Sequence, residues 1–196
     1  MYSASSPYRI ITVCTGNICR SPMAELMLTE AFDAGGLGGA VVVDSAGTTS
    51  YEAGHPIDPR AARVLSAHRI RSEKHVARSW RQEWFRERDL ILALDVDHYG
   101  WLHEAAPDSQ TLAKIRMLRS FDPAVAGRST LDLGIEDPWY GGHHDFDVTW
   151  NLIRAAVPGI VAHTRAALAA GHQGAGHQGA GHPAQHLDPQ QVRSIS

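Results

Sequence analysis

Apolar and polar stretches alternate along this chain with the spacing of an α/β protein. Short apolar runs without internal alternation predict buried strands, because a strand covered on both faces has no polar side. Three such runs lie at residues 8–13, 41–43 and 90–94, and a fourth, less apolar one lies at 114–118. These four segments are the strands that the sequence predicts.

Helical patterns fill the intervals between these strands. Residues 22–34 carry apolar side chains at helical spacing, and Pro22 is expected at the first helical position. Asp58 and Pro59 predict the N-cap and first residue of a helix that runs to about His68. Further helices are expected at 81–88, 98–105 and 145–170, the last one broken or distorted near Val157-Pro158-Gly159.

This alternation predicts one α/β domain at residues 8–170, with a four-stranded parallel sheet of order 2-1-3-4 and helices on both faces. The loop after the first strand then lies at the carboxyl edge, where the strand order reverses and ligands of such sheets bind. Residues 1–7 are expected to be a flexible N-terminus. Residues 171–196 repeat Gly-His-Gln-Gly-Ala and carry few apolar side chains, so we expect a disordered tail.

Composition narrows the class of protein. Of the 196 residues, 43% are hydrophobic and 20% are charged, which is typical of soluble globular proteins. A formal net charge of -3 without a basic cluster argues against a nucleic-acid partner. No apolar run is long enough to span a membrane, and the N-terminal residues lack a signal-peptide pattern. We therefore expect a cytoplasmic protein without nucleic-acid or membrane partners.

The loop after the first strand carries the candidate chemistry. Its sequence is Cys14-Thr15-Gly16-Asn17-Ile18-Cys19-Arg20-Ser21-Pro22, and it holds both cysteines of the chain. Two cysteines in one loop form no disulfide framework, so we expect them to serve chemistry.

A strand, a short loop and a helix start form an anion site, because free backbone N–H groups converge there. These groups and the Arg20 cation favour a nucleophilic thiolate at Cys14, and the planar guanidinium of Arg20 can hold two phosphate oxygens. The alternative interpretation of Cys14 is a small apolar residue at the end of a buried strand. The loop predicts a phosphate-transfer site that needs no metal or organic cofactor.

A second stretch, Asp137-Pro138-Trp139-Tyr140, completes a resemblance to the low-molecular-weight protein tyrosine phosphatases, and most closely to their bacterial, actinobacterial-type members. The resemblance covers residues 8–168. It also includes Asp44-Ser45, Asp58-Pro59-Arg60-Ala61 and His75-Val76-Ala77-Arg78.

The resemblance implies a protein-tyrosine phosphatase that acts on phosphotyrosine-containing proteins and is inhibited by phosphate or vanadate-like oxyanions. Cys14 would attack phosphorus, while Arg20 and the loop from Thr15 to Ser21 hold the phosphate oxygens. Asp137 would protonate the departing phenolate and then activate the water that cleaves the phosphocysteine.

Aromatic residues support these assignments. Asp-Pro pairs also begin at Asp58, Asp122 and Asp188, so the pair alone does not select an acid. Trp139 and Tyr140 follow only Asp137, where they can flank a phosphotyrosine ring. Tyr51 resembles the aromatic at the rim of the family's site; some relatives have tryptophan there.

Several polar residues are implied to hold the loop in shape. Asn17 resembles the family asparagine in a left-handed turn, a conformation that asparagine tolerates. The family ties this asparagine to a serine and a histidine–aspartate pair, matched here by Ser45, His75 and Asp95. On sequence alone, each of these three is more often a satisfied polar group of the core than a catalytic residue, so we expect them to support the loop rather than to take part in the reaction.

Two loop residues keep two interpretations each. Ser21 is either a hydrogen-bond donor to the Cys14 thiolate or an ordinary serine at a helix N-terminus. Cys19 is either a packing residue or a redox partner that captures oxidised Cys14 as a disulfide.

Three other functions are considered as alternatives to tyrosine phosphatase activity. An arsenate reductase of the same fold needs cysteines outside the loop, and the chain has none after Cys19. In protein arginine phosphatases the residue after the loop asparagine tends to be threonine, whereas Ile18 stands here. An inactive phosphotyrosine-binding module would lack the nucleophile, the clamp or the acid, and this chain has all three.

Overall fold

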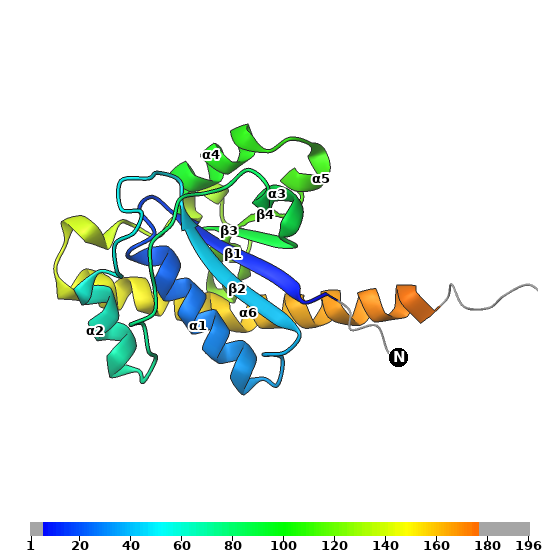
Figure 1. Cartoon of the computed structure of the whole chain (residues 1–196), viewed down its shortest axis with the longest axis horizontal. Coiled ribbons are helices and arrows are strands. Elements are labelled where there is room, and N and C mark those ends of the chain that lie inside the picture. The colour runs from blue at the N-terminus through cyan, green and yellow to red at the C-terminus, as the bar shows by residue number, and fades with distance from the viewer. Residues whose placement is uncertain (1–5, 177–196) are drawn as a thin grey trace, which may run out of the picture.

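The computed structural model describes residues 6–176, and its centre is a parallel sheet of four strands. The strands are β1 (Tyr8–Cys14), β2 (Val41–Gly47), β3 (Leu90–Ala93) and β4 (Ile115–Met117). Their order is β2-β1-β3-β4, and all neighbours are parallel, which confirms the predicted topology (Figure 1). β2 runs four residues beyond the predicted strand because its whole length pairs with β1, from Tyr8 opposite Val41 to Cys14 opposite Gly47.

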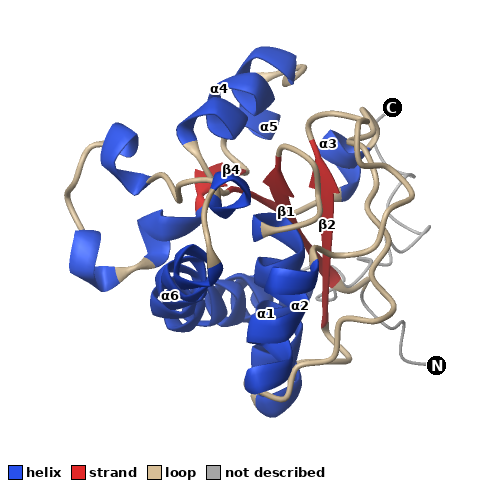
Figure 2. Cartoon of the chain, turned by 90° about the vertical axis from the view of Figure 1, so that its left-hand side faces the viewer, coloured by secondary structure: helices blue, strands red, loops and turns tan. Residues whose placement is uncertain are grey.

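Helices cover both faces of the sheet, as predicted (Figures 1 and 2). One face carries α1 (Arg20–Ala34), α2 (Pro59–Ala67) and α6 (His143–Gly176). The other carries α3 (Trp84–Glu87), α4 (Val96–Ala105) and α5 (Ser109–Leu112). Four 3₁₀ turns follow β4: η1 (Leu118–Phe121), η2 (Pro123–Val125), η3 (Thr130–Leu133) and η4 (Pro138–Tyr140).

Successive residues of each central strand enter opposite cores. Ile10 and Leu92 pack into the core shared with α1, α2 and α6. Ile11 and Ile91 pack into the second core, with Leu102 of α4. A strand buried on both faces needs apolar residues at every position, which explains the continuous apolar runs.

The start of α1 differs from the prediction. The helix begins at Arg20, two residues before Pro22, with Cys19 at the N-cap. Proline fits throughout the first helical turn, because the backbone N–H that it lacks has no partner inside the helix there. The prediction that Pro22 lies in the first turn of the helix was therefore correct, but the prediction that it is the first helical residue was wrong.

The predicted break in the last helix was wrong, because α6 continues through Pro158. Its apolar residues on both sides of the proline, including Ile153 and Ile160, are fully buried, and this burial outweighs the one backbone hydrogen bond that proline removes. Gly159 lets the helix approach η1, since a Cβ there would lie 2.1 Å from the Phe121 carbonyl oxygen.

α6 extends to Gly176, so residues 171–176, the first part of the expected disordered tail, are helical. The rest of that tail, residues 177–196, and residues 1–5 of the expected flexible N-terminus lie outside the described part of the chain. Within residues 6–176, no helix combines the length and apolar character needed to cross a membrane.

Candidate active site

The loop that follows β1 lies at the carboxyl edge of the sheet, as predicted. β1 ends at Cys14, and α1 begins at Arg20. The start of the β2–α2 connection packs on this loop, with the Thr48 N–H donating to the Cys14 carbonyl at 2.8 Å. Gly47 is required at this approach, because a Cβ there would lie 2.6 Å from the Thr15 carbonyl oxygen.

The Cys14 thiol is buried among hydrogen-bonding groups. Its Sγ accepts from the Asn17 backbone N–H at 3.3 Å and lies 2.9 Å from Ser21 Oγ. Within the described residues, the backbone N–H groups of Gly16, Ile18 and Cys19 donate to no protein acceptor. These free donors and the start of α1 form the arrangement that binds anions.

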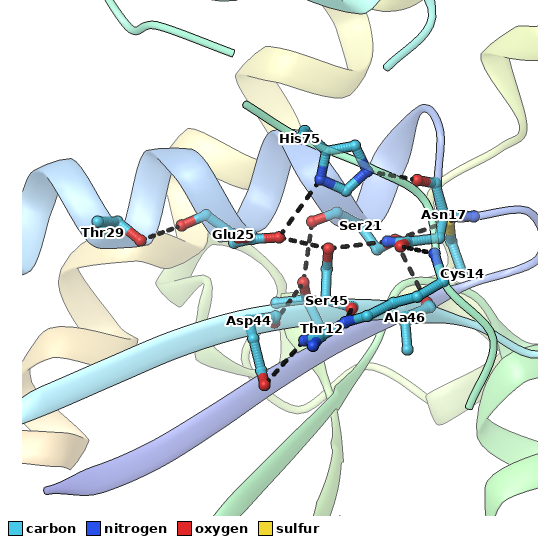
Figure 3. A network of polar contacts seen from close by, with 11 residues as sticks. Thr12, Cys14, Asn17, Ser21, Glu25, Thr29, Asp44, Ser45, Ala46 and His75 are labelled. Carbon is cyan, nitrogen blue, oxygen red and sulfur yellow. Dashed lines mark hydrogen bonds and ion pairs between the residues drawn. The ribbon is translucent and has the colours of Figure 1, made fainter. Parts of the chain in front are cut away.

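Asn17 fixes the shape of the loop through both its backbone and its side chain (Figure 3). Its φ of 61° is left-handed. The side-chain amide donates to Ser21 Oγ at 2.9 Å and to Ser45 Oγ at 2.8 Å, and its oxygen accepts from the Arg78 N–H at 2.9 Å. The backbone carbonyl accepts a hydrogen bond from His75 Nε2 at 2.8 Å. The implied contacts of Asn17 with Ser45 and His75 are thus present.

The acidic partner of this network is Glu25, not Asp95. Glu25 accepts a short hydrogen bond from Ser45 Oγ, and its carboxylate lies 3.8 Å from His75 Nδ1 (Figure 3). Burial raises the pKa of Glu25 and lowers that of His75. The histidine–aspartate pairing was wrong because Asp95 is the N-cap of α4, where it accepts from the Val96 N–H and contacts Arg20.

Arg20 joins three parts of the chain at the base of the site. Its side chain is almost completely buried. One terminal nitrogen, Nη1, donates to Asp95 at 3.2 Å and to the Ile135 carbonyl at 2.9 Å, and Nη2 donates to Asp137 at 2.6 Å. Its Nε is a buried donor without a partner among the described residues. The proposed clamp and the proposed acid are therefore in direct contact.

His98 belongs to the same cluster, although sequence reasoning missed it. It is 3% exposed, and its Nε2 lies 2.9 Å from Thr15 Oγ1. Burial, helped by the Arg20 cation, lowers the pKa of His98 to about 3, so the ring is neutral at neutral pH. Asp95 is the N-cap of α4 and His98 lies in its first turn, so the start of this helix brings both side chains to the site.

The loop after β1 and the segment 137–140 border a cleft of about 160 Å³. Cys14, Arg20 and Asp137 line it, and Tyr51, Trp139 and Tyr140 form its rim. The exposed fractions of these three rings are 84%, 44% and 90%. Large exposed aromatic rings around a small polar base suit a flat aromatic ligand that carries an anionic group.

Cys19 also lines the cleft, and neither cysteine is in a disulfide. Burial, with the nearby Asp58 carboxylate, raises the pKa of the Cys19 thiol. Cys19 is therefore a neutral thiol at neutral pH. Within residues 6–176, no cluster of three His, Cys, Asp or Glu side chains is arranged to hold a metal ion.

Comparison with known proteins gives one consistent match. The family model described as low molecular weight phosphotyrosine protein phosphatase matches residues 9–171. A low molecular weight protein-tyrosine-phosphatase of Streptomyces coelicolor is 45% identical over 158 residues, which are 81% of this chain and 94% of that protein. The low molecular weight protein-tyrosine phosphatase A of Mycobacterium tuberculosis is 43% identical over 156 residues, covering 80% and 91%.

Solved structures agree with this match. A protein tyrosine phosphatase from Entamoeba histolytica, crystallised with Hepes in its active site, superposes with a TM-score of 0.72 at 29% identity, covering 79% of this chain and 94% of that one. The Bacillus subtilis protein YfkJ superposes with a TM-score of 0.74 at 28% identity, covering 83% and 98%.

Proposed function

The chain belongs to the low molecular weight phosphotyrosine protein phosphatases, a family of hydrolases, and we propose that it hydrolyses phosphotyrosine through a phosphocysteine on Cys14. One observation supports this most strongly. Cys14, Arg20 and Asp137 line the same small cleft, although Asp137 is 117 residues from Arg20. A nucleophile, a cationic clamp and an acid are the groups that this reaction needs.

In the first step, the Cys14 sulfur forms a bond to phosphorus while the bond from phosphorus to the phenolic oxygen breaks. Asp137, in its protonated form once it has left the ion pair with Arg20, gives its proton to that oxygen, so tyrosine leaves as a neutral phenol. The free N–H groups of the loop and the unpartnered Nε of Arg20 hold the phosphoryl oxygens. Asp137 must exchange its contact with Arg20 for the leaving oxygen.

In the second step, water attacks the phosphocysteine. The Asp137 carboxylate takes a proton from the water, the bond between sulfur and phosphorus breaks, and inorganic phosphate leaves with Cys14 again a thiolate. Ser21 Oγ accepts from the Asn17 amide, so its own proton is available to the sulfur 2.9 Å away. This hydrogen bond stabilises the thiolate as it departs.

The walls of the cleft favour phosphotyrosine over phosphoarginine. Tyr51, Trp139 and Tyr140 offer ring faces to a phenol. Ile18 is apolar, whereas a threonine there would offer a hydroxyl to position water. An arsenate reductase needs further cysteines to pass on a disulfide, and the sequence has only Cys14 and Cys19.

Oxidation of Cys14 would stop the reaction, because its sulfur must be free to attack phosphorus. Cys14 must be a free thiol for turnover, a state that the reducing cytoplasm maintains. If peroxide converts Cys14 to a sulfenic acid, we propose that the Cys19 sulfur bonds to the Cys14 sulfur while the bond from that sulfur to its hydroxyl breaks; the Cys19 proton joins the hydroxyl and leaves as water. Reduction of this disulfide would return the active thiol.

The proposed function is tested by hydrolysis of matched peptides that carry phosphotyrosine, phosphoserine or phosphoarginine. We expect turnover of the phosphotyrosine peptide and its inhibition by vanadate and inorganic phosphate. Preferred hydrolysis of the phosphoarginine peptide would instead identify an arginine phosphatase. Failure to hydrolyse any of the three would contradict phosphatase activity.

A further inference from the structure

Arg60, in the first turn of α2, connects the two loops that form the cleft. Its Nη1 donates to the carbonyl oxygens of Trp139 at 3.3 Å and Gly141 at 3.0 Å. The guanidinium also lies 5.5 Å from the centre of the Trp139 ring and 4.7 Å from that of Phe146 in α6. Arg60 thus holds the segment 137–141, the acid loop, by both hydrogen bonds and ring contacts.

On its other side, Arg60 is fixed through Asp58 to the loop of residues 14–21 that follows β1, the phosphate loop. Arg60 Nε and Nη2 donate to the two carboxylate oxygens of Asp58 at 3.1 and 2.9 Å. Asp58 is 5% exposed, and its backbone N–H donates to the Ile18 carbonyl at 2.8 Å. A continuous chain of contacts therefore runs from Ile18 to Trp139.

The ion pair in this chain is charged at neutral pH. Burial acts to raise the pKa of Asp58, but hydrogen bonds from the side chain and backbone of Arg60 outweigh it and hold the pKa below its usual value. A buried carboxylate that is fixed by a planar bidentate partner has little freedom to move. The pair is a rigid support on which the acid loop rests.

The acid loop has few other supports. Pro138 is buried, but Trp139 is 44% exposed and Tyr140 is 90% exposed, so burial orders the end of the acid loop only in part. Among the described residues, the hydrogen bonds that reach 138–141 from outside the segment 137–145 come from Arg60 alone. Asp137 itself is held by Arg20, a contact that must open for catalysis. When the contact between Asp137 and Arg20 opens, the hydrogen bonds from Arg60 still hold the acid loop.

Resting on the function proposed above, we propose that Arg60 is a positioning residue that holds the acid loop so that Asp137 meets the leaving oxygen. It acts through the Trp139 and Gly141 carbonyls and touches neither phosphate nor nucleophile. Its loss should therefore impair protonation of the leaving group and spare phosphate binding. A lysine at this position keeps the charge beside Asp58 but lacks the planar fork that reaches both sides.

The test compares wild type, Arg60→Lys and Arg60→Met on aryl phosphates whose phenols differ in pKa. Phenyl phosphate needs an acid, whereas p-nitrophenyl phosphate needs one much less. We expect kcat/KM for phenyl phosphate to fall about tenfold more than that for p-nitrophenyl phosphate in both variants, a part of the usual contribution of general acid catalysis. Vanadate should inhibit the variants as it inhibits wild type, which also verifies that the phosphate loop is folded.

Two controls separate positioning from general damage. Arg63→Met removes an exposed arginine of the same helix whose Nη1 lies 3.3 Å from His143 Nε2, and it should leave the ratio between the two substrates unchanged. In an Asp137→Ala background, Arg60→Lys should cause no further change in that ratio, because both substitutions remove the same proton transfer.

An equal loss of kcat/KM on both substrates, or a ratio that shifts as much without Asp137 as with it, would overturn the positioning role. If wild type hydrolyses these esters and Arg60→Lys shows the wild-type ratio, this inference fails while the proposed function stands. If wild type hydrolyses neither ester, the proposed function itself fails.

Discussion

Arg20 Nη2 lies 2.6 Å from Asp137 Oδ2, so the proposed phosphate clamp and the proposed acid form an ion pair across the cleft. Arg20 is buried, and Asp137 approaches it from the exposed side. A phosphate that enters the loop meets a cation that is already paired with a carboxylate. Binding must therefore include a rearrangement of this contact.

Removal of the Asp137 carboxylate should strengthen oxyanion binding. In Asp137→Ala, Arg20 loses a competing partner and the anion loses a nearby negative charge, so we expect inorganic phosphate to bind roughly fivefold more tightly, or about 1 kcal/mol. Competitive inhibition or calorimetry measures this affinity. Glu136→Ala removes the same charge from the neighbouring residue, which has no ion pair with Arg20, and it should change affinity little. Weaker phosphate binding in Asp137→Ala would contradict the view that the Asp137 carboxylate and phosphate compete for Arg20.

Asn17 should control the shape of the phosphate loop. Asn17→Ala removes three side-chain hydrogen bonds and places alanine at a φ of 61°. We expect the free energy of unfolding to fall by about 2–4 kcal/mol and vanadate inhibition to weaken more than roughly tenfold. Arg69 is the matched control, with a φ of 64° outside the loop. Arg69→Ala should leave vanadate inhibition unchanged, and a similar weakening there would assign the effect to general destabilisation.

Ser21→Ala should slow the second step more than the first. The Ser21 hydroxyl is 2.9 Å from the Cys14 sulfur, and a hydrogen bond to a charged group is worth about 1.5–3 kcal/mol. With p-nitrophenyl phosphate, we expect kcat to fall by roughly tenfold or more and kcat/KM to fall less, with a larger burst of nitrophenol in stopped flow. Equal losses of kcat and kcat/KM without a burst would assign Ser21 to the first step.

His98 should make stability fall at acidic pH. Its folded pKa of about 3 lies below the usual value, so at pH 3–6.5 the unfolded chain binds a proton that the folded protein does not. Its contribution is complete above pH 6.5 and is lost as pH decreases toward 3, by about 1.4 kcal/mol per pH unit.

The variant His98→Gln keeps a polar group near Thr15 Oγ1 but does not titrate. Urea unfolding from pH 7 to pH 5 should therefore show a shallower loss of stability in His98→Gln than in wild type. His163, which is exposed on α6 and whose pKa is also lowered, supplies the comparison variant His163→Gln. Identical pH slopes in wild type and His98→Gln would show that His98 is not the group responsible.

The sheet was predictable because its signals are local. Strands such as 90–94 are continuous apolar runs, and Asp58 and Pro59 mark a helix start within two residues. Continuation of α6 through Pro158 was not predictable in this way, because it depends on packing against η1, which is distant in sequence.

In the candidate site, too, the residues within one stretch of sequence were predictable, whereas those brought in by tertiary contacts were not. The loop residues were predictable because their chemistry lies within a single stretch of sequence. Their supports come from three helices and come together only after folding: His98 contacts Thr15, Glu25 contacts Ser45, and Arg60 contacts Trp139. His75 illustrates the limit: sequence indicated that it supports Asn17, but only the structure shows Glu25, rather than Asp95, beside it.

The central claim is that Cys14 carries the phosphoryl group during turnover. The direct measurement is acid quenching of the enzyme during hydrolysis of a phosphotyrosine peptide, followed by mass spectrometry of the peptide that holds Cys14 and Cys19. We predict one added phosphoryl group, located by fragmentation on Cys14, and neither this group nor turnover in Cys14→Ser. Sustained turnover by Cys14→Ser, or a phosphoryl group found only on another residue, would contradict the account.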